Sequence, residues 1–269
     1  MKRAVMAVLA MAPLLAQAAL PCGFDTATLA FAGTPQTQAR CLLRYVSRGG
    51  VVDAKPATLP PLLESLVGTA APSVDFIRYA ASKPATDLGG DLGRPLERVR
   101  YFVIHDTSTP WLGDAPAFPA DDAPELNRIA QYAGPNAVAH VFINRLGETV
   151  LGHDFAEPWR ATKFETKVIG QPAKGLFVHI ELMQPRRRDP QGSPKNDLIA
   201  PLPGFTPAQY EKLALLYAAA SARAGRWLVP AFHADLDEGL DDAHDDPQHF
   251  EIDAFAAALQ RLINHLKES

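Results

Sequence analysis

Two apolar segments of the sequence each end in a histidine. His105 follows residues 101–104, and His233 follows residues 227–232. An aspartate pair, Asp245-Asp246, lies in a polar loop after the second histidine. Imidazole and carboxylate groups are ligands that Zn²⁺ accepts, and a catalytic zinc site has three protein ligands and one position for water. The sequence therefore predicts a zinc site; the alternative is two hydrogen-bonded histidines beside a solvated acidic loop.

A third apolar segment, residues 175–183, carries polar side chains at alternating positions. The period of two predicts a strand in which His179 and Glu181 point to one face and their apolar neighbours to the other. From this pattern alone, Glu181 is an exposed strand residue or one half of an ion pair.

The segments around these candidates predict the sheet that must hold them. Strands are expected at residues 101–104, 138–144, 149–151, 175–183 and 227–232, and helices at residues 124–133, 206–224 and 253–266. The second of these helices begins with Thr206 as the N-cap, Pro207 as the first helical residue and Gln209 at the third position. The fold class is therefore α/β, with a mixed central β-sheet flanked by helices.

The N-terminal part of the chain differs in character. Residues 1–18 combine a basic start, an apolar stretch and small residues at the end, which is typical of a cleaved signal peptide. We therefore expect a periplasmic or secreted protein with no transmembrane segment after cleavage. Residues 19–95 predict a small, mostly helical extension that ends in a linker at residues 83–94, and residues 96–269 form the main domain.

The extension holds both cysteines of the chain, Cys22 and Cys41. An oxidising compartment favours a disulfide between them, and the alternative is two separate buried thiols. Short helices are expected at residues 38–46 and 62–67. Of the 269 residues, 47% are hydrophobic and 21% are charged, which is ordinary for a globular protein, and the net charge of −4 predicts no nucleic-acid partner.

Six motifs, in order, resemble the type 2 N-acetylmuramoyl-L-alanine amidases, which share a fold with the peptidoglycan recognition proteins. They are Phe102-Val103-Ile104-His105-Asp106-Thr107, Ala139-His140-Val141-Phe142-Ile143-Asn144 with Gly147, Glu157-Pro158-Trp159, His179-Ile180-Glu181-Leu182, Phe205-Thr206-Pro207-Ala208-Gln209-Tyr210, and His233 through Asp246-Pro247. The resemblance implies that His105, His233 and Asp246 bind Zn²⁺ and that Glu181 is catalytic. It also implies hydrolysis of the amide between N-acetylmuramic acid and L-alanine, in peptidoglycan or in muropeptides.

The sequence departs from the family pattern at several positions. His244 stands where many members have a lysine that stabilises the oxyanion, so His244 is a candidate catalytic residue or else a structural loop residue. The interval from His233 to Asp246 is longer than usual, which leaves Asp245 as a rival ligand. Arg160 stands where many relatives have histidine. His179 replaces a small residue, and it is expected to tune Glu181 or to touch the substrate.

The loop of residues 184–203 contains three consecutive arginines, Arg186, Arg187 and Arg188. We expect a solvated surface loop; the alternative is that these guanidinium groups bind carboxylates of the stem peptide. Two functions besides the amidase are open from the sequence. The first is a peptidoglycan-binding protein without activity, and the second is a zinc peptidase that cleaves another amide of the stem peptide.

Overall fold

The computed structural model describes residues 22–44, 57–71, 73–134, 137–193 and 196–268. The predicted signal peptide, residues 1–18, lies outside the described residues. So does the end of the helix predicted at residues 38–46. Within the described ranges, no helix combines the length and the apolar character that a membrane span requires.

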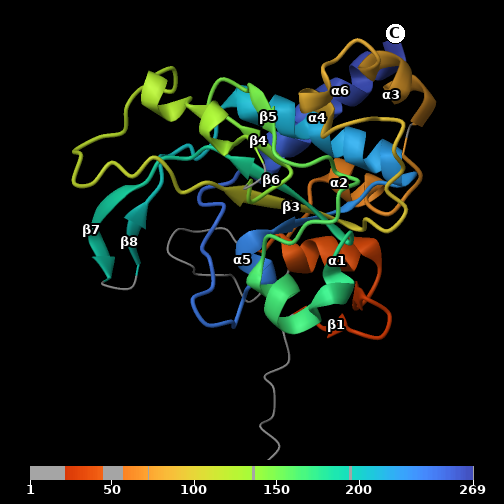
Figure 1. Ribbon diagram of the computed structural model, residues 1–269, viewed down its shortest axis with the longest axis horizontal. Coiled ribbons are helices and arrows are strands. Elements are labelled where there is room, and N and C mark those ends of the chain that lie inside the picture. Colours follow the sequence, from red (N-terminus) through yellow and green to blue (C-terminus); the bar gives the residue numbers. More distant parts are fainter. Residues whose placement is uncertain (1–21, 45–56, 72, 135–136, 194–195, 269) are drawn as a thin grey trace, which may run out of the picture.

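A five-stranded sheet forms the centre of the protein (Figure 1), with the strand order β5-β4-β6-β3-β9. Its strands are β3 (Tyr101–Asp106), β4 (Val141–Ile143), β5 (Thr149–Leu151), β6 (Phe177–Leu182) and β9 (Val229–Phe232). Neighbouring strands from β4 to β9 are parallel, and β5 is antiparallel to β4. The predicted mixed sheet with a hairpin at one edge is confirmed.

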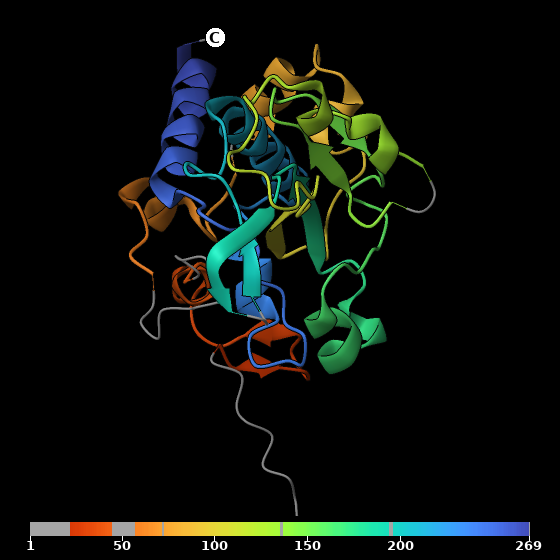
Figure 2. The same cartoon turned by 90° about the vertical axis from the view of Figure 1, so that its left-hand side faces the viewer.

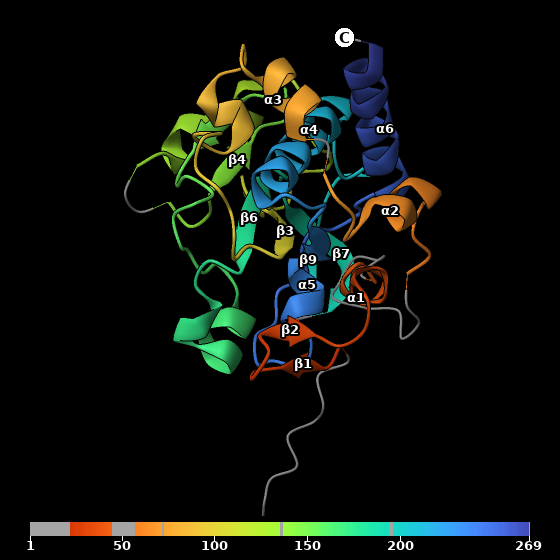
Figure 3. The same ribbon diagram turned by 90° about the vertical axis from the view of Figure 1, so that its right-hand side faces the viewer.

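Helices flank this sheet, as predicted. They are α1 (Pro35–Leu42), α2 (Pro61–Leu66), α3 (Ser73–Ala80), α4 (Pro207–Ala224), α5 (His233–Leu236) and α6 (Ile252–Glu268). Thr206 caps α4 in a reciprocal capping box with Gln209, which confirms the predicted helix start. Figure 3 shows α4 against the sheet with α6 beside it.

The alternating side chains of β3 explain how both faces of the sheet are covered. Phe102 contacts Tyr217 of α4, with ring centroids 5.1 Å apart. Its neighbour Tyr101 points to the opposite face, where its ring contacts Phe31 and its hydroxyl accepts a hydrogen bond from the Phe31 backbone N–H at 3.0 Å. Phe31 belongs to the hairpin of β1 (Phe24–Asp25) and β2 (Ala30–Phe31), so the N-terminal extension covers this face.

The extension and the main domain share one continuous hydrophobic core, which runs from Cys22 to Leu266. The predicted disulfide between Cys22 and Cys41 is present, with Cα atoms 5.8 Å apart. Within the segment predicted as a linker, the Gly89 carbonyl accepts hydrogen bonds from the Phe155 N–H and from the Arg223 guanidinium. The extension is therefore packed onto the sheet, with no gap in the core at residue 95.

Two sequence predictions of local structure are wrong. The helix predicted at residues 124–133 is broken into two short 3₁₀ turns, because the Asn127 side chain donates to the carbonyls of Asp121 and Ala123 and interrupts the helical pattern. The loop predicted at residues 184–203 is largely the hairpin of β7 (Arg187–Ser193) and β8 (Asn196–Ile199). Figure 2 shows this hairpin at the front of the molecule.

Candidate metal centre

Three neighbouring parallel strands carry the candidate residues at their carboxyl ends. β3 lies between β6 and β9, and His105 of β3 is paired in register with Glu181 of β6. His233 follows β9 directly, as the first residue of α5. Ligands of α/β proteins generally bind at this edge of the sheet, outside the carboxyl ends of the strands. The strand order thus brings together residues that are 76 (181 minus 105) and 52 (233 minus 181) positions apart in the sequence.

His105, His233 and Asp246 form a buried cluster that could hold a metal ion. The Nδ1 atoms of the two histidines are 2.9 Å apart. The Asp246 carboxylate is 3.0 Å from His233 Nδ1 and 3.8 Å from His105 Nδ1. Ligand atoms about 2.0–2.1 Å from a tetrahedral zinc ion lie roughly 3.3 Å from each other, so this spacing fits the ion. Of the two aspartates that the sequence left open, Asp246 is the one in the cluster.

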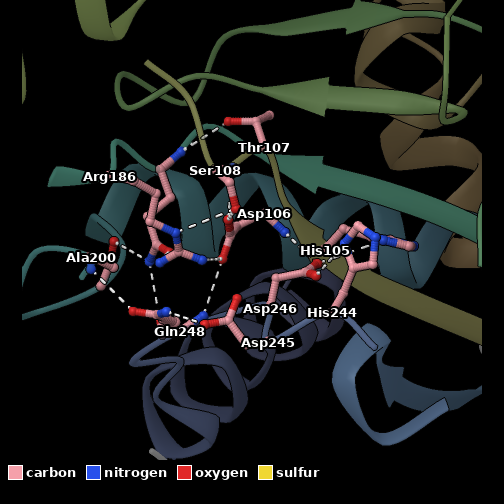
Figure 4. Close-up of polar contacts among 12 residues, drawn as sticks. His105, Asp106, Thr107, Ser108, Arg186, Ala200, His244, Asp245, Asp246 and Gln248 are labelled. Carbon is pink, nitrogen blue, oxygen red and sulfur yellow. Dashed lines mark hydrogen bonds and ion pairs between the residues drawn. The ribbon is translucent and has the colours of Figure 1, made fainter. Parts of the chain in front are cut away.

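Asp245 turns away from the cluster (Figure 4). Its Oδ2 accepts a hydrogen bond from Gln248 Nε2 at 2.5 Å. His244 lies at the rim, with 53% of its side chain exposed and its Nδ1 3.5 Å from the Asp246 carboxylate. The ring of His244 stacks on that of His233 at a centroid distance of 4.4 Å. His244 can therefore reach a bound substrate, whereas Asp245 stabilises the loop.

The outer nitrogens of both histidines in the cluster are also occupied, but by different groups. His233 Nε2 is 3.0 Å from Oδ2 of Asp237, a carboxylate that also accepts backbone N–H groups of Lys163 and Phe164. His105 Nε2 is 3.0 Å from Nδ1 of His179. Such contacts orient a metal-binding imidazole and fix which nitrogen faces the ion. The sequence did not predict Asp237, and it predicted that His179 acts on Glu181 or substrate, whereas His179 contacts His105.

A fully buried carboxylate, Glu165, lies behind His179. Its Oε2 is 3.2 Å from His179 Nε2, without the alignment of a hydrogen bond, and it accepts the N–H and hydroxyl groups of Thr162. A carboxylate at this distance favours the His179 proton on Nε2, which leaves Nδ1 free to accept from His105. His105 then presents its Nδ1 lone pair to the cluster.

The two histidines of the cluster differ in charge. Burial lowers the pKa of His105 well below its ordinary value, and the neighbouring imidazoles of His233 and His179 lower it further. Burial also opposes the charged form of His233, but Asp246 and Asp237 outweigh it and raise the pKa of His233 to about 10. For Asp246, burial raises the pKa, and the charge of His233 outweighs it and holds the pKa well below the ordinary range. Without a metal, His233 and Asp246 therefore form an ion pair.

Glu181 faces the cluster from β6. Its Oε1 is 3.9 Å from His105 Nδ1, its Oε2 makes no hydrogen bond to the described residues, and 12% of its side chain is exposed. Burial raises the pKa of Glu181 well above its ordinary value, and the nearby carboxylates of Asp246 and Asp106 raise it further. Glu181 therefore lies where a carboxyl group can exchange a proton with a group that reacts at the cluster.

A cavity of 520 Å³ opens beside the cluster. Glu181, His233, His244 and Asp246 line one side of it. Aromatic and aliphatic side chains line another part, and residues 159–163 add Arg160 and Lys163. A cavity with an apolar wall and a few converging polar groups is the usual form of a small-molecule site.

A buried polar network supports the Asp246 loop, and Figure 4 shows it. Arg186 is 1% exposed, and its guanidinium donates to Asp106 Oδ2 and Gln184 Oε1, both at 2.7 Å. Asp106 also accepts the Gln248 backbone N–H, while its own backbone N–H donates to Asp246 at 3.2 Å. The prediction of a solvated surface loop is therefore wrong for Arg186, which is a buried support of the cluster.

Comparison with protein-family models, curated proteins and solved structures finds no match for this chain. The functional conclusion therefore rests on the geometry of the site and on the six sequence motifs.

Proposed function

We propose that the protein is a zinc-dependent N-acetylmuramoyl-L-alanine amidase of the type 2 class, which hydrolyses the amide between N-acetylmuramic acid and L-alanine in peptidoglycan or muropeptides. The observation that carries the proposal is the buried cluster of His105, His233 and Asp246 with Glu181 beside it, next to a cavity that His233, Asp246 and Glu181 line. The donor set of two imidazoles and one carboxylate suits Zn²⁺ and leaves a fourth position on the cavity side.

His105, His233 and Asp246 would hold the zinc ion, which would supply a water of lowered pKa and polarise the amide carbonyl. Glu181 accepts a proton from the attacking water and delivers it to the leaving amine of L-alanine. The Oε2 atom of Glu181, which has no hydrogen-bond partner in the described part of the chain, is the atom proposed for this transfer. His244, at the rim beside Asp246, donates a hydrogen bond to the oxygen that becomes negative in the transition state.

The protein is proposed to act in the periplasm or outside the cell, where its substrate lies. The disulfide between Cys22 and Cys41 supports this location, because disulfides form and persist in oxidising compartments.

The test is mass spectrometry of muropeptides incubated with the purified protein, with and without a chelator. Peptides that begin at L-alanine, together with peptide-free sugars, should form only when zinc is present. Glu181→Gln should keep zinc and lose turnover by about 10²-fold or more. Glu125→Gln removes an exposed carboxylate elsewhere and should change neither.

Three other outcomes would replace the proposal. Cleavage within the stem peptide would make the protein a zinc peptidase. Muropeptides that bind and stay intact would make it a binding protein. Loss of zinc in Glu181→Gln would make Glu181 a ligand and leave the reaction without its base.

A further inference from the structure

The cavity beside the cluster has walls of opposite charge. Asp106, Glu181 and Asp246 line the side formed by the sheet and the Asp246 loop. Arg160 and Lys163 line the side formed by residues 159–163. Because Arg186 is bonded to Asp106 and lies outside the cavity lining, Arg160 and Lys163 are the arginine and lysine side chains that line the cavity among the described residues.

These two cations differ in what already binds them. The Nζ of Lys163 donates to the carbonyl of Asp242, so Lys163 ties its segment to the acidic loop before the cluster. Arg160 is half-buried, and its guanidinium makes no hydrogen bond or ion pair with the described part of the chain. A guanidinium is a planar fork of donors that matches a carboxylate through two parallel hydrogen bonds.

The residue before Arg160 is held firmly. Trp159 donates from Nε1 to the Val138 carbonyl at 2.9 Å, and its ring stacks on His153 at a centroid distance of 4.0 Å. The His153 ring is fixed in turn by contacts of its two nitrogens with Glu157 Oε1 and the Ala137 carbonyl. The position of Arg160 at the cavity wall is therefore set by a packed aromatic pair, which reduces the entropy lost when a ligand binds there.

We propose that Arg160 is the carboxylate-binding residue of the substrate cavity. It would bind a free carboxylate of the peptide part while the scissile amide lies at the cluster. This inference rests on the proposed function, because it assigns the anionic group of that substrate. The arginines after β6, for which carboxylate binding was the alternative, have other partners: Arg186 binds Asp106 and Arg188 binds Asp114, and both lie outside this cavity.

The experiment compares a muropeptide that has free stem-peptide carboxylates with the same muropeptide in which they are primary amides. Binding is measured by calorimetry, and cleavage by the zinc-loaded protein is measured separately. Arg160→Met should weaken binding of the acid form about 10- to 100-fold, the range for a hydrogen-bonded charged group, with a matching rise in KM. The amide form should bind the variant and the wild-type protein equally.

Lys167→Met is the matched control. Lys167 is exposed in the same segment and does not line the cavity, so its removal changes the net charge without touching the site. Equal losses for the acid and amide forms in Arg160→Met, or a loss of the same size in Lys167→Met, would overturn the inference. Charge-dependent binding without cleavage would retain the Arg160 subsite and refute the amidase, so the two failures are distinguishable.

Discussion

The two histidines of the candidate metal cluster each direct an Nδ1 atom toward the other, but their surroundings differ. His105 lies in β3, an interior strand of the sheet, and its outer nitrogen contacts another imidazole, that of His179. His233 lies in the first turn of a short helix at the end of an edge strand, and carboxylates contact both of its nitrogens. One histidine is therefore neutral in the metal-free protein and the other is charged.

This difference explains how the buried cluster can be stable in the metal-free protein. Asp246 is fully buried, and a buried carboxylate without a counter-charge is strongly unfavourable. The proton on His233 supplies that counter-charge in the metal-free protein. His105 needs no proton, because the orientation of its ring is set by the sheet and by His179. A bound metal ion would replace the proton on His233 and would meet the lone pair that His105 already presents.

The largest expected effect comes from removing each histidine. His105→Ala and His233→Ala should both abolish zinc binding. In the metal-free protein, His233→Ala should lower the unfolding free energy by about 3–5 kcal/mol, because it leaves buried carboxylates without their cation. His105→Ala should cost about 1–3 kcal/mol for the lost hydrogen bonds. Urea unfolding of the two metal-free variants measures these free energies. Equal losses of unfolding free energy in both variants would contradict the proposed difference in charge between His105 and His233.

A second prediction concerns the residues that contact the Nε2 atoms of His105 and His233. His179→Ala frees the outer nitrogen of His105 and should weaken zinc binding about 10- to 100-fold. Asp237→Asn keeps a hydrogen-bond acceptor for His233 and should weaken zinc binding by about tenfold or less. Competition with a chromogenic chelator measures both affinities.

The control for these variants is His153→Gln, which changes a buried histidine that contacts Glu157 and the Ala137 carbonyl, away from the cluster. Its zinc affinity should equal that of the wild-type protein. A His179→Ala variant that binds zinc normally would show that the sheet alone orients His105.

Much of this site could be predicted from the sequence, because its ligands follow apolar strands or stand in a conspicuous Asp-Pro pair. The order of the strands in the sheet was not predictable from the sequence. It is this order that places His105 beside Glu181. Asp237 carried a usable signal, since it lies four residues after His233 on a helical turn. Glu165 carried none, because its partner His179 belongs to a distant strand.

Arg186 shows why composition misled the prediction for its segment. Three consecutive arginines are typical of a solvated loop, but residue 186 forms an isolated bridge with Trp111 next to the start of β7, with its side chain buried against Asp106. The exposed Arg188, two residues later, does fit the expectation of a surface cation. The three arginines therefore begin with a buried residue and end with an exposed one, and only the tertiary structure shows where the change occurs.

The last expected effect is a dependence of stability on pH that the two histidines do not share. The raised pKa of His233, about 10, means that its proton stabilises the metal-free protein fully below the unfolded value near 6.5, and that this stability is lost as the pH rises toward 10. Between pH 7 and 9 the unfolding free energy should fall by up to about 1.4 kcal/mol per pH unit, the slope for one proton.

His105 adds nothing in that window, because its lowered pKa leaves it neutral in both the folded and the unfolded chain above pH 7. Glu181 has a raised pKa and acts in the same direction as His233, so the measurement is made on Glu181→Gln, where that contribution is absent. Urea titrations of this metal-free variant at several pH values give the slope. An unfolding free energy that does not change with pH would mean that His233 is neutral and that another group balances the charge of Asp246. In saturating zinc the pH dependence should also disappear, because the ion takes the place of the proton.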